Sequence, residues 1–117
     1  MALDKNFVDT TSFDILQPAI DYYLSKGTPD EKLKTYYYQG RIYQNRQDRD
    51  NAISSFAKAV DISPMCTDTL CIARSLVAQG ILYYDFYDFN GYIDNYLAAG
   101  KLYHQVSDTD HELDCLL

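Results

Sequence analysis

Apolar residues recur at intervals of three and four along most of this chain, which is the period of an α-helix with one buried face. The first such segment covers residues 13–26, and its apolar positions are Ile15, Leu16, Ala19, Ile20, Tyr23 and Leu24. Because proline is tolerated in a first helical turn, the regular helix is expected to begin near Pro18. Gly27-Thr28-Pro29 then supplies a stop, a cap and a restart.

The same period predicts two pairs of helices after this restart. The first pair covers residues 29–46 and 50–62, with its turn at 47–49. The second pair begins near residue 67 and ends near 104, and we place its turn at residues 88–91, where Asn-Gly is a strong turn dipeptide. Short connections of this kind make neighbouring helices pack antiparallel. The predicted fold class is therefore all-α, with about five to six helices in antiparallel pairs.

One string in the first pair returns in looser form in the second. Three of its residues, Tyr36, Gly40 and Tyr43, share one face of the first helix. The partner helix then carries Ala52, Phe56 and Ala59, and Pro64 follows it. The second copy runs Leu76, Gly80, Tyr83, Tyr92, Tyr96 and Ala99. A glycine at the crossing lets the antiparallel partner approach closely, and the facing alanines and aromatic ring fill the contact. The large Tyr92 stands where the first copy has Ala52.

This order and spacing resembles the tetratricopeptide (TPR) repeat, closely over residues 33–106 and loosely over 13–32. The resemblance implies one TPR-like domain over residues 1–117, built as a short α-solenoid. Its parts are a half repeat (13–26), a repeat (33–66), an extended repeat (67–106) and the start of a further helix (107–117). The positions that would build the scaffold are Tyr36, Gly40, Tyr43, Ala52, Phe56, Ala59, Pro64, Gly80, Tyr83, Tyr96 and Ala99.

The amino-acid sequence of residues 27–43 is also similar to TPR segments of Bacteroides-type bacterial proteins. The last residues, Cys115-Leu116-Leu117, are apolar, whereas a solenoid ends on a polar capping helix. We therefore expect a soluble excerpt of a longer bacterial protein, and leave open whether it is cytoplasmic or extracytoplasmic.

In TPR proteins the concave groove is lined by the other face of the first helix of each pair. Carried onto this chain, the resemblance assigns the groove to Lys34, Tyr37, Arg41, Gln44, Arg74, Val77, Ile81 and Tyr84. Three of the ten basic residues of the chain fall in this set, which implies capture of a peptide or protein with an acidic element. The alternative is that they are ordinary solvated helix residues. A chaperone-tail adaptor is not expected, because Tyr37, Arg41 and Ala78 replace the Lys and Asn of that clamp.

Composition narrows the function classes. A net charge of −7 and a pI near 4.5 oppose binding to a nucleic-acid backbone. No apolar run approaches the roughly 18 residues of a membrane span, so we expect no direct membrane contact. The twelve tyrosines, with no tryptophan, are interpreted as repeat slots whose phenol reaches water.

The residues that could carry chemistry are few. His104, Asp108, Asp110, His111 and Glu112 form a ligand-like cluster, which a helix end followed by a new N-cap explains as well. Cys66, Cys71 and Cys115 lack a zinc-ligand spacing and are expected to be free thiols. No nucleophile-elbow, phosphate-loop or zinc-protease motif occurs. The sequence therefore predicts no catalytic residue, metal or cofactor, and no enzyme.

Two functions remain at this stage. The leading one is a non-catalytic scaffold that binds a peptide or protein segment in the concave groove, and a variant lets the chain self-associate through its C-terminal helix. The alternative is a sensory or regulatory TPR segment of a bacterial signal-transduction or transcription-regulator protein.

Overall fold

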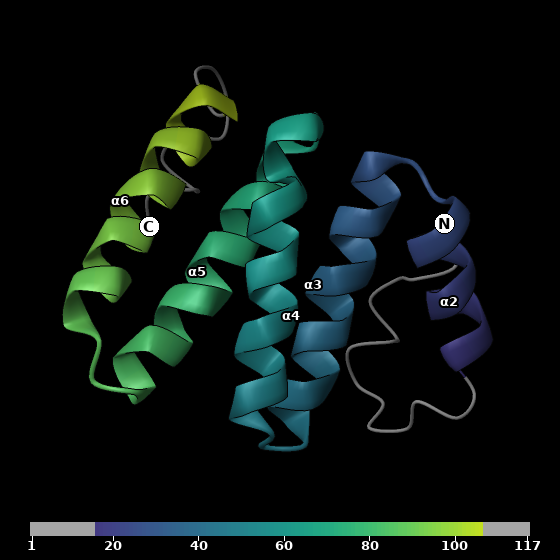
Figure 1. Cartoon of the computed structure of the whole chain (residues 1–117). Coiled ribbons are helices and arrows are strands. Elements are labelled where there is room, and N and C mark those ends of the chain that lie inside the picture. The colour runs from purple at the N-terminus through teal and green to yellow at the C-terminus, as the bar shows by residue number, and fades with distance from the viewer. Residues whose placement is uncertain (1–15, 107–117) are drawn as a thin grey trace. The chain divides into compact units, whose positions relative to one another are not determined.

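The computed structural model describes residues 16–106, which form five α-helices and one short 3-10 helix. In chain order these are α2 (Gln17–Lys26), α3 (Pro29–Asn45), α4 (Arg49–Ile62), η1 (Ser63–Met65), α5 (Thr69–Asp85) and α6 (Phe89–Val106). The predicted all-α class is confirmed, and the helices pack in adjacent antiparallel pairs (Figure 1). The chain divides into two units, Met1–Cys66 and Thr67–Leu117.

The first unit begins with two helices whose ends are set by local chemistry. Pro18 lies in the first turn of α2, where its missing N–H costs nothing. Thr28 caps α3 through a reciprocal pair of hydrogen bonds: its Oγ1 accepts from the Glu31 N–H at 3.2 Å, and Glu31 Oε1 accepts from the Thr28 N–H at 3.0 Å. Pro29 then occupies the first helical position. The predicted stop and restart at residues 27–29 is thus a complete capping box.

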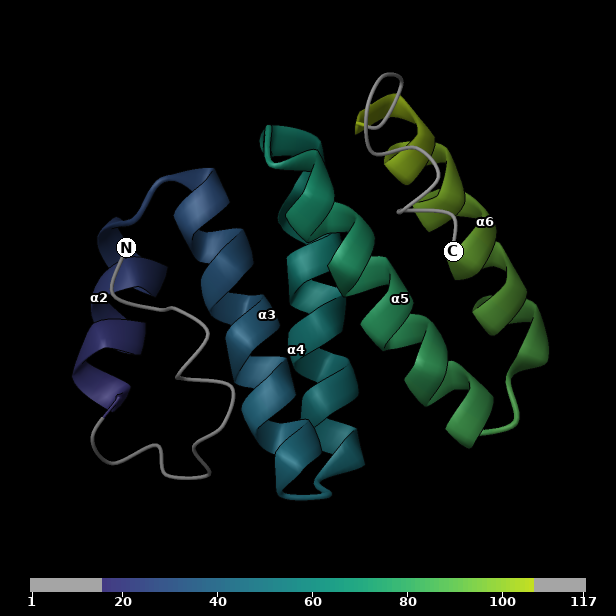
Figure 2. The same ribbon diagram turned by 180° about the vertical axis from the view of Figure 1, so that it is seen from behind.

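The core of the first unit lies between α3 and α4, which run side by side in Figure 2. Ala52, Phe56 and Ala59 of α4 are fully buried. Gly40 of α3 faces them, since a Cβ atom added there would lie 2.5 Å from the Phe56 ring. The glycine is therefore needed for the close approach of these two helices.

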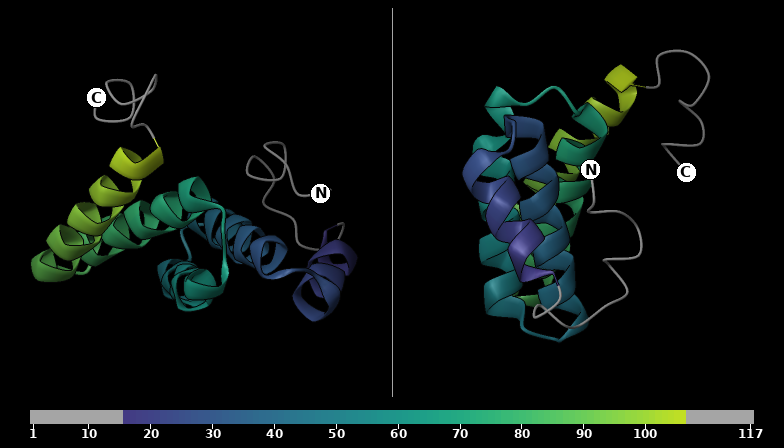
Figure 3. Two further views of the ribbon diagram at one scale, coloured as in Figure 1. Left: turned by 90° about the horizontal axis from the view of Figure 1, so that it is seen from above. Right: turned by 90° about the vertical axis from the view of Figure 1, so that its right-hand side faces the viewer.

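In the second unit α5 and α6 lie along each other, as the left panel of Figure 3 shows. Asn95 of α6 bridges the pair, because its Nδ2 donates to the Leu76 carbonyl at 3.1 Å and to Gln79 Oε1 at 2.8 Å. A Cβ atom added to Gly80 would lie 3.3 Å from Asn95 and 3.4 Å from Tyr96. This contact is looser than the one at Gly40.

The turn between α5 and α6 corrects the prediction from Asn90-Gly91. Helix α6 begins at Phe89, so both residues lie in its first turn. The chain reverses instead around Tyr87, whose φ is 64°, and Asp88 Oδ1 caps α6 by accepting from the Gly91 N–H at 3.0 Å. An Asp N-cap outweighed the turn preference of Asn-Gly.

The α3–α4 turn is built in the same way, 40 residues earlier. Gln47 has a φ of 61°, and Asp48 Oδ1 accepts from the Asn51 N–H at 3.3 Å. Each turn also closes through a backbone bond from the capping Asp N–H to a tyrosine carbonyl, Asp48 to Tyr43 at 2.9 Å and Asp88 to Tyr83 at 2.7 Å. The two helix pairs thus share one local design.

Candidate binding surfaces on α3 and on the α5–α6 pair

The four residues assigned to a groove on α3 are all half-buried. They are Lys34, Tyr37, Arg41 and Gln44. Two of them contact each other: Arg41 Nη1 donates to the Tyr37 hydroxyl at 2.9 Å, and the Arg41 guanidinium carbon lies 5.9 Å from the Tyr37 ring centroid. The Tyr37 ring also packs against Phe56, with centroids 5.9 Å apart. Tyr37 therefore joins the α3 surface to the core of the first unit.

One hydrogen-bond donor of the Arg41 guanidinium is buried. Within residues 16–106, its Nε is a buried side-chain atom with no hydrogen-bond partner. Buried donors in proteins are normally satisfied by protein, water or a ligand acceptor. The prediction of an acidic partner element was made from the basic residues Lys34, Arg41 and Arg74, and it stays a prediction.

The four assigned residues of α5 differ in exposure. Arg74, Ile81 and Tyr84 are exposed, and Val77 is half-buried. Ile81 and Tyr84 meet two residues of α6, Tyr92 and Tyr96, around a hollow of about 200 Å³. The structure thus brings two predicted groove residues together with two that were not assigned to binding. We call these four residues the tyrosine hollow.

The rings of the tyrosine hollow stand at steep angles to one another. The Tyr84 and Tyr92 centroids are 5.2 Å apart with the ring planes at 64°, and Tyr92 and Tyr96 are 4.6 Å apart at 55°. Tyr84 also meets Phe89 edge to face at 5.2 Å. Burial, with a smaller contribution from Tyr92, raises the pKa of Tyr96 above its ordinary value.

The origin of the hollow is visible when the two helix pairs are compared. Forty residues before Tyr92 and Tyr96, α4 carries Ala52 and Phe56, both at 0% exposure. Tyr96 is instead 37% exposed, and the Tyr92 ring packs on its aromatic neighbours at the surface. The sequence signal was present, since two tyrosines four residues apart share a helix face, but we interpreted Tyr96 as scaffold only.

The other positions assigned to the scaffold have varied burial. Gly40, Ala52, Phe56, Ala59, Gly80 and Ala99 are buried; Tyr36, Tyr43 and Tyr83 are half-buried; Pro64 is exposed and lies in η1. A Cβ atom added to Gly91 would lie 2.9 Å from Tyr83, so this glycine serves packing against α5.

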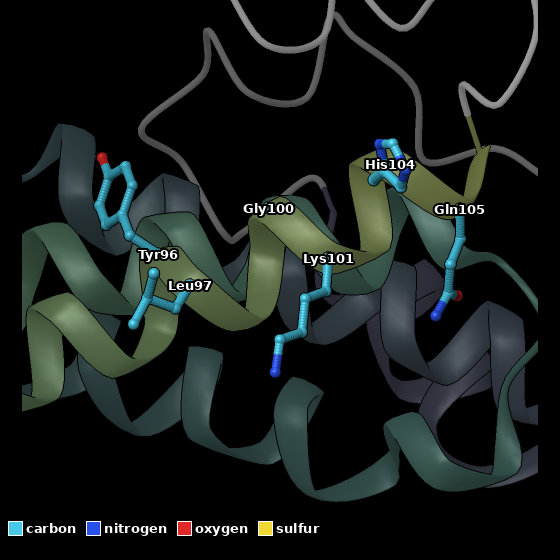
Figure 4. Close-up of a pocket in the computed structure, with 6 residues that line it drawn as sticks. All are labelled: Tyr96, Leu97, Gly100, Lys101, His104 and Gln105. Carbon is cyan, nitrogen blue, oxygen red and sulfur yellow. The ribbon is translucent and has the colours of Figure 1, made fainter.

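A second, open depression lies along α6 (Figure 4). All its lining residues come from that helix, and they are Tyr96, Leu97, Gly100, Lys101, His104 and Gln105. Leu97 is 63% exposed, and a Cβ atom added to Gly100 would meet no atom within 4 Å. This is one open helix face with no convergent polar groups.

The ligand-like cluster of the sequence analysis lies mostly beyond residue 106. His104 lies near the end of α6, whereas the other members of its cluster, Asp108, Asp110, His111 and Glu112, lie outside the described residues. In the described part of the chain, no group of three or more His, Cys, Asp or Glu could hold a metal ion.

The cysteines were expected to be thiols, and Cys66 and Cys71 form no disulfide; Cys115 lies outside the described residues. Cys66 donates weakly to the Ile62 and Pro29 carbonyls, at 3.3 Å each. Between residues 16 and 106, no helix is long and apolar enough to cross a membrane.

No protein-family model matches the chain, and no match is found among curated proteins or solved structures.

Proposed function

We propose that this chain is a non-catalytic, TPR-like interaction scaffold that binds a peptide or protein segment. The observation that carries the proposal is the tyrosine hollow. Ile81, Tyr84 and Tyr96 expose between 37% and 53% of their surface around it, and Phe89 beside it exposes 48%. Exposed apolar clusters of this kind mark interaction sites, and tyrosine is enriched among the residues that dominate binding energy.

The TPR-like part of the proposal draws support from the two matching helix pairs. Gly40 and Gly80 each face the partner helix, and Gln47 and Tyr87 each have a positive φ. The two glycines are 40 residues apart, as are Gln47 and Tyr87, an interval longer than the 34 of a regular TPR. Repeat units of this sort stack because one unit cannot bury its apolar face alone, and their exposed faces hold other proteins.

The experiment selects ligands from a library of random 12-residue peptides displayed on phage, with the folded chain as bait. Binding of selected synthetic peptides is then measured by fluorescence anisotropy against the wild type, Tyr84→Ala and Tyr22→Ala. Tyr22 is a matched control, since it is 58% exposed and belongs to α2 of the first unit, whereas the hollow belongs to the second. We expect Tyr84→Ala to weaken binding about tenfold and Tyr22→Ala to leave it unchanged.

Two outcomes count against the proposal. One is that no peptide is enriched over a heat-unfolded bait. The other is that selected peptides bind wild type and Tyr84→Ala equally, which would place their contact elsewhere. The acidic element expected at α3 is tested in the same assay with Arg41→Glu, which should weaken peptides rich in Asp and Glu. The sensory alternative depends on flanking sequence and stays a prediction.

A further inference from the structure

We infer that the tyrosine hollow binds an alkylammonium group, carried by a basic side chain of the partner segment. This inference rests on the proposed function and specifies the chemistry of the bound segment. Its basis is the arrangement of Tyr84, Tyr92 and Tyr96 together with the charge of the unit that contains them.

The proposed site is a partial cage of three tyrosine rings, which border the hollow. Tyr92 packs against both other tyrosines, and the 64° and 55° angles between the ring planes turn their faces in different directions. Aromatic faces carry the negative part of the ring quadrupole and attract a cation within about 6 Å of the centroid. The hollow of about 200 Å³ is several times the roughly 30 Å³ that a water occupies, so an ammonium group fits with part of its methylene chain.

The charge of the second unit favours a cation over an anion. Among the described residues of this unit, 67–106, four are acidic and two are basic, hence a charge of −2, whereas residues 16–66 contain six acidic and seven basic residues, hence +1. The described part of the unit that carries the hollow is therefore net negative. Such a field raises the local concentration of cations.

One acidic side chain shares a helix face with a residue of the hollow. Asp85 follows Ile81 by four residues and so lies on the same face of α5. The basic residues of this unit, Arg74 and Lys101, do not line the hollow. An uncharged aliphatic side chain would fit the same space, so it is the negative charge of the surroundings that favours an ammonium group over it.

The test compares two probes of similar shape, tetramethylammonium and its neutral analogue 2,2-dimethylpropanol. Each is titrated into the full chain at constant ionic strength, and carbon–proton NMR spectra follow the tyrosine rings. We expect saturable shifts of Tyr84, Tyr92 and Tyr96 with tetramethylammonium, and binding of the neutral probe weaker by about two- to fivefold or more. Equal affinity for both probes would overturn the inference.

Variants assign the effect to the rings. Tyr84 is 53% exposed, so Tyr84→Leu leaves the core intact; it should weaken tetramethylammonium binding about two- to fivefold, while Tyr84→Phe retains it. Tyr22→Leu should change neither titration. Shifts that survive Tyr84→Leu unchanged would refute the cage.

A final arm separates this inference from the proposed function. In a selected peptide, each lysine is replaced by norleucine, which keeps the methylene chain and removes the charge. Loss of binding supports the inference. If peptides bind through Tyr84 regardless of this change, the scaffold stands and the ammonium specificity fails; if no peptide binds at all, the scaffold itself fails.

Discussion

Alanine substitution at three helical glycines measures how tightly each helix pair is packed. Gly40, Gly80 and Gly100 all lie inside helices, where replacing glycine by alanine stabilises by about 0.8–1 kcal/mol if nothing else changes. The added methyl group meets very different surroundings at the three sites. The series therefore separates helix propensity from packing with one substitution.

The contact distances set the expected order. At Gly100 the new Cβ atom meets nothing within 4 Å, so the full gain of about 0.8–1 kcal/mol should appear. At Gly40 it would lie 2.5, 2.7 and 2.8 Å from three carbons of the buried Phe56 ring. Overpacking of this kind typically costs about 1–3 kcal/mol, which leaves a net loss of up to about 2 kcal/mol. Gly80→Ala should be nearly neutral, since its contacts are 3.3–3.4 Å and Tyr96 can yield.

The assay must resolve the two units, because Gly40 lies in one and Gly100 in the other. Native-state hydrogen exchange read by mass spectrometry gives the opening free energy of α3–α4 and α5–α6 separately. Urea unfolding followed by circular dichroism measures the free energy of unfolding of the whole chain as a check. We expect Gly40→Ala to lower protection of α3–α4 and Gly100→Ala to raise that of α5–α6.

A double-mutant cycle tests the cause. Phe56→Leu removes the ring that the methyl group would strike, so Gly40→Ala should be better tolerated in that background, with a coupling of about 1 kcal/mol. The reasoning is refuted if Gly40→Ala stabilises the first unit as Gly100→Ala stabilises the second.

Three further substitutions follow from single features of the structure. Ala59→Leu inserts a large side chain at a fully buried site and should cost about 1–3 kcal/mol; an unchanged melting curve would contradict the packing of α4 on α3. Tyr87→Gly should stabilise the chain by up to about 1 kcal/mol in urea unfolding, because glycine adopts a φ of 64° without the Cβ clash; a loss would show that Tyr87 makes compensating contacts. Burial and Tyr92 raise the pKa of Tyr96 in the folded state above its value in the unfolded chain. Protonated Tyr96 therefore contributes fully to the free energy of unfolding below about pH 10, and this contribution is lost as the pH rises through the folded-state pKa. Tyr96→Phe should flatten that alkaline decline in urea midpoints measured from about pH 9 to 11, and an identical slope would contradict the shift.

The helices and most of their ends were predictable from the sequence, since they depend on interactions within a few residues. The capping box of Thr28 and Glu31 and the stop at Pro64 are local features. The close approach at Gly40 was also predictable, because a glycine three and four residues from aromatic neighbours marks a helix crossing. The misplaced α5–α6 turn shows the limit of this reasoning. Asn90-Gly91 and Asp88 were competing local signals, and spacing along the chain did not show that the cap at Asp88 would outweigh the turn dipeptide.

For the candidate site, too, some features follow from the sequence and others only from the tertiary structure. The sequence by itself determined an all-α chain, its helix periods and a tyrosine-rich composition, because these follow from spacing along one helix at a time. Only the tertiary structure decided that Tyr84 of α5 meets Tyr92 and Tyr96 of α6 around a hollow, while Tyr37 turns toward Phe56. Contacts between helices depend on their separation and rotation, which no single-helix pattern records.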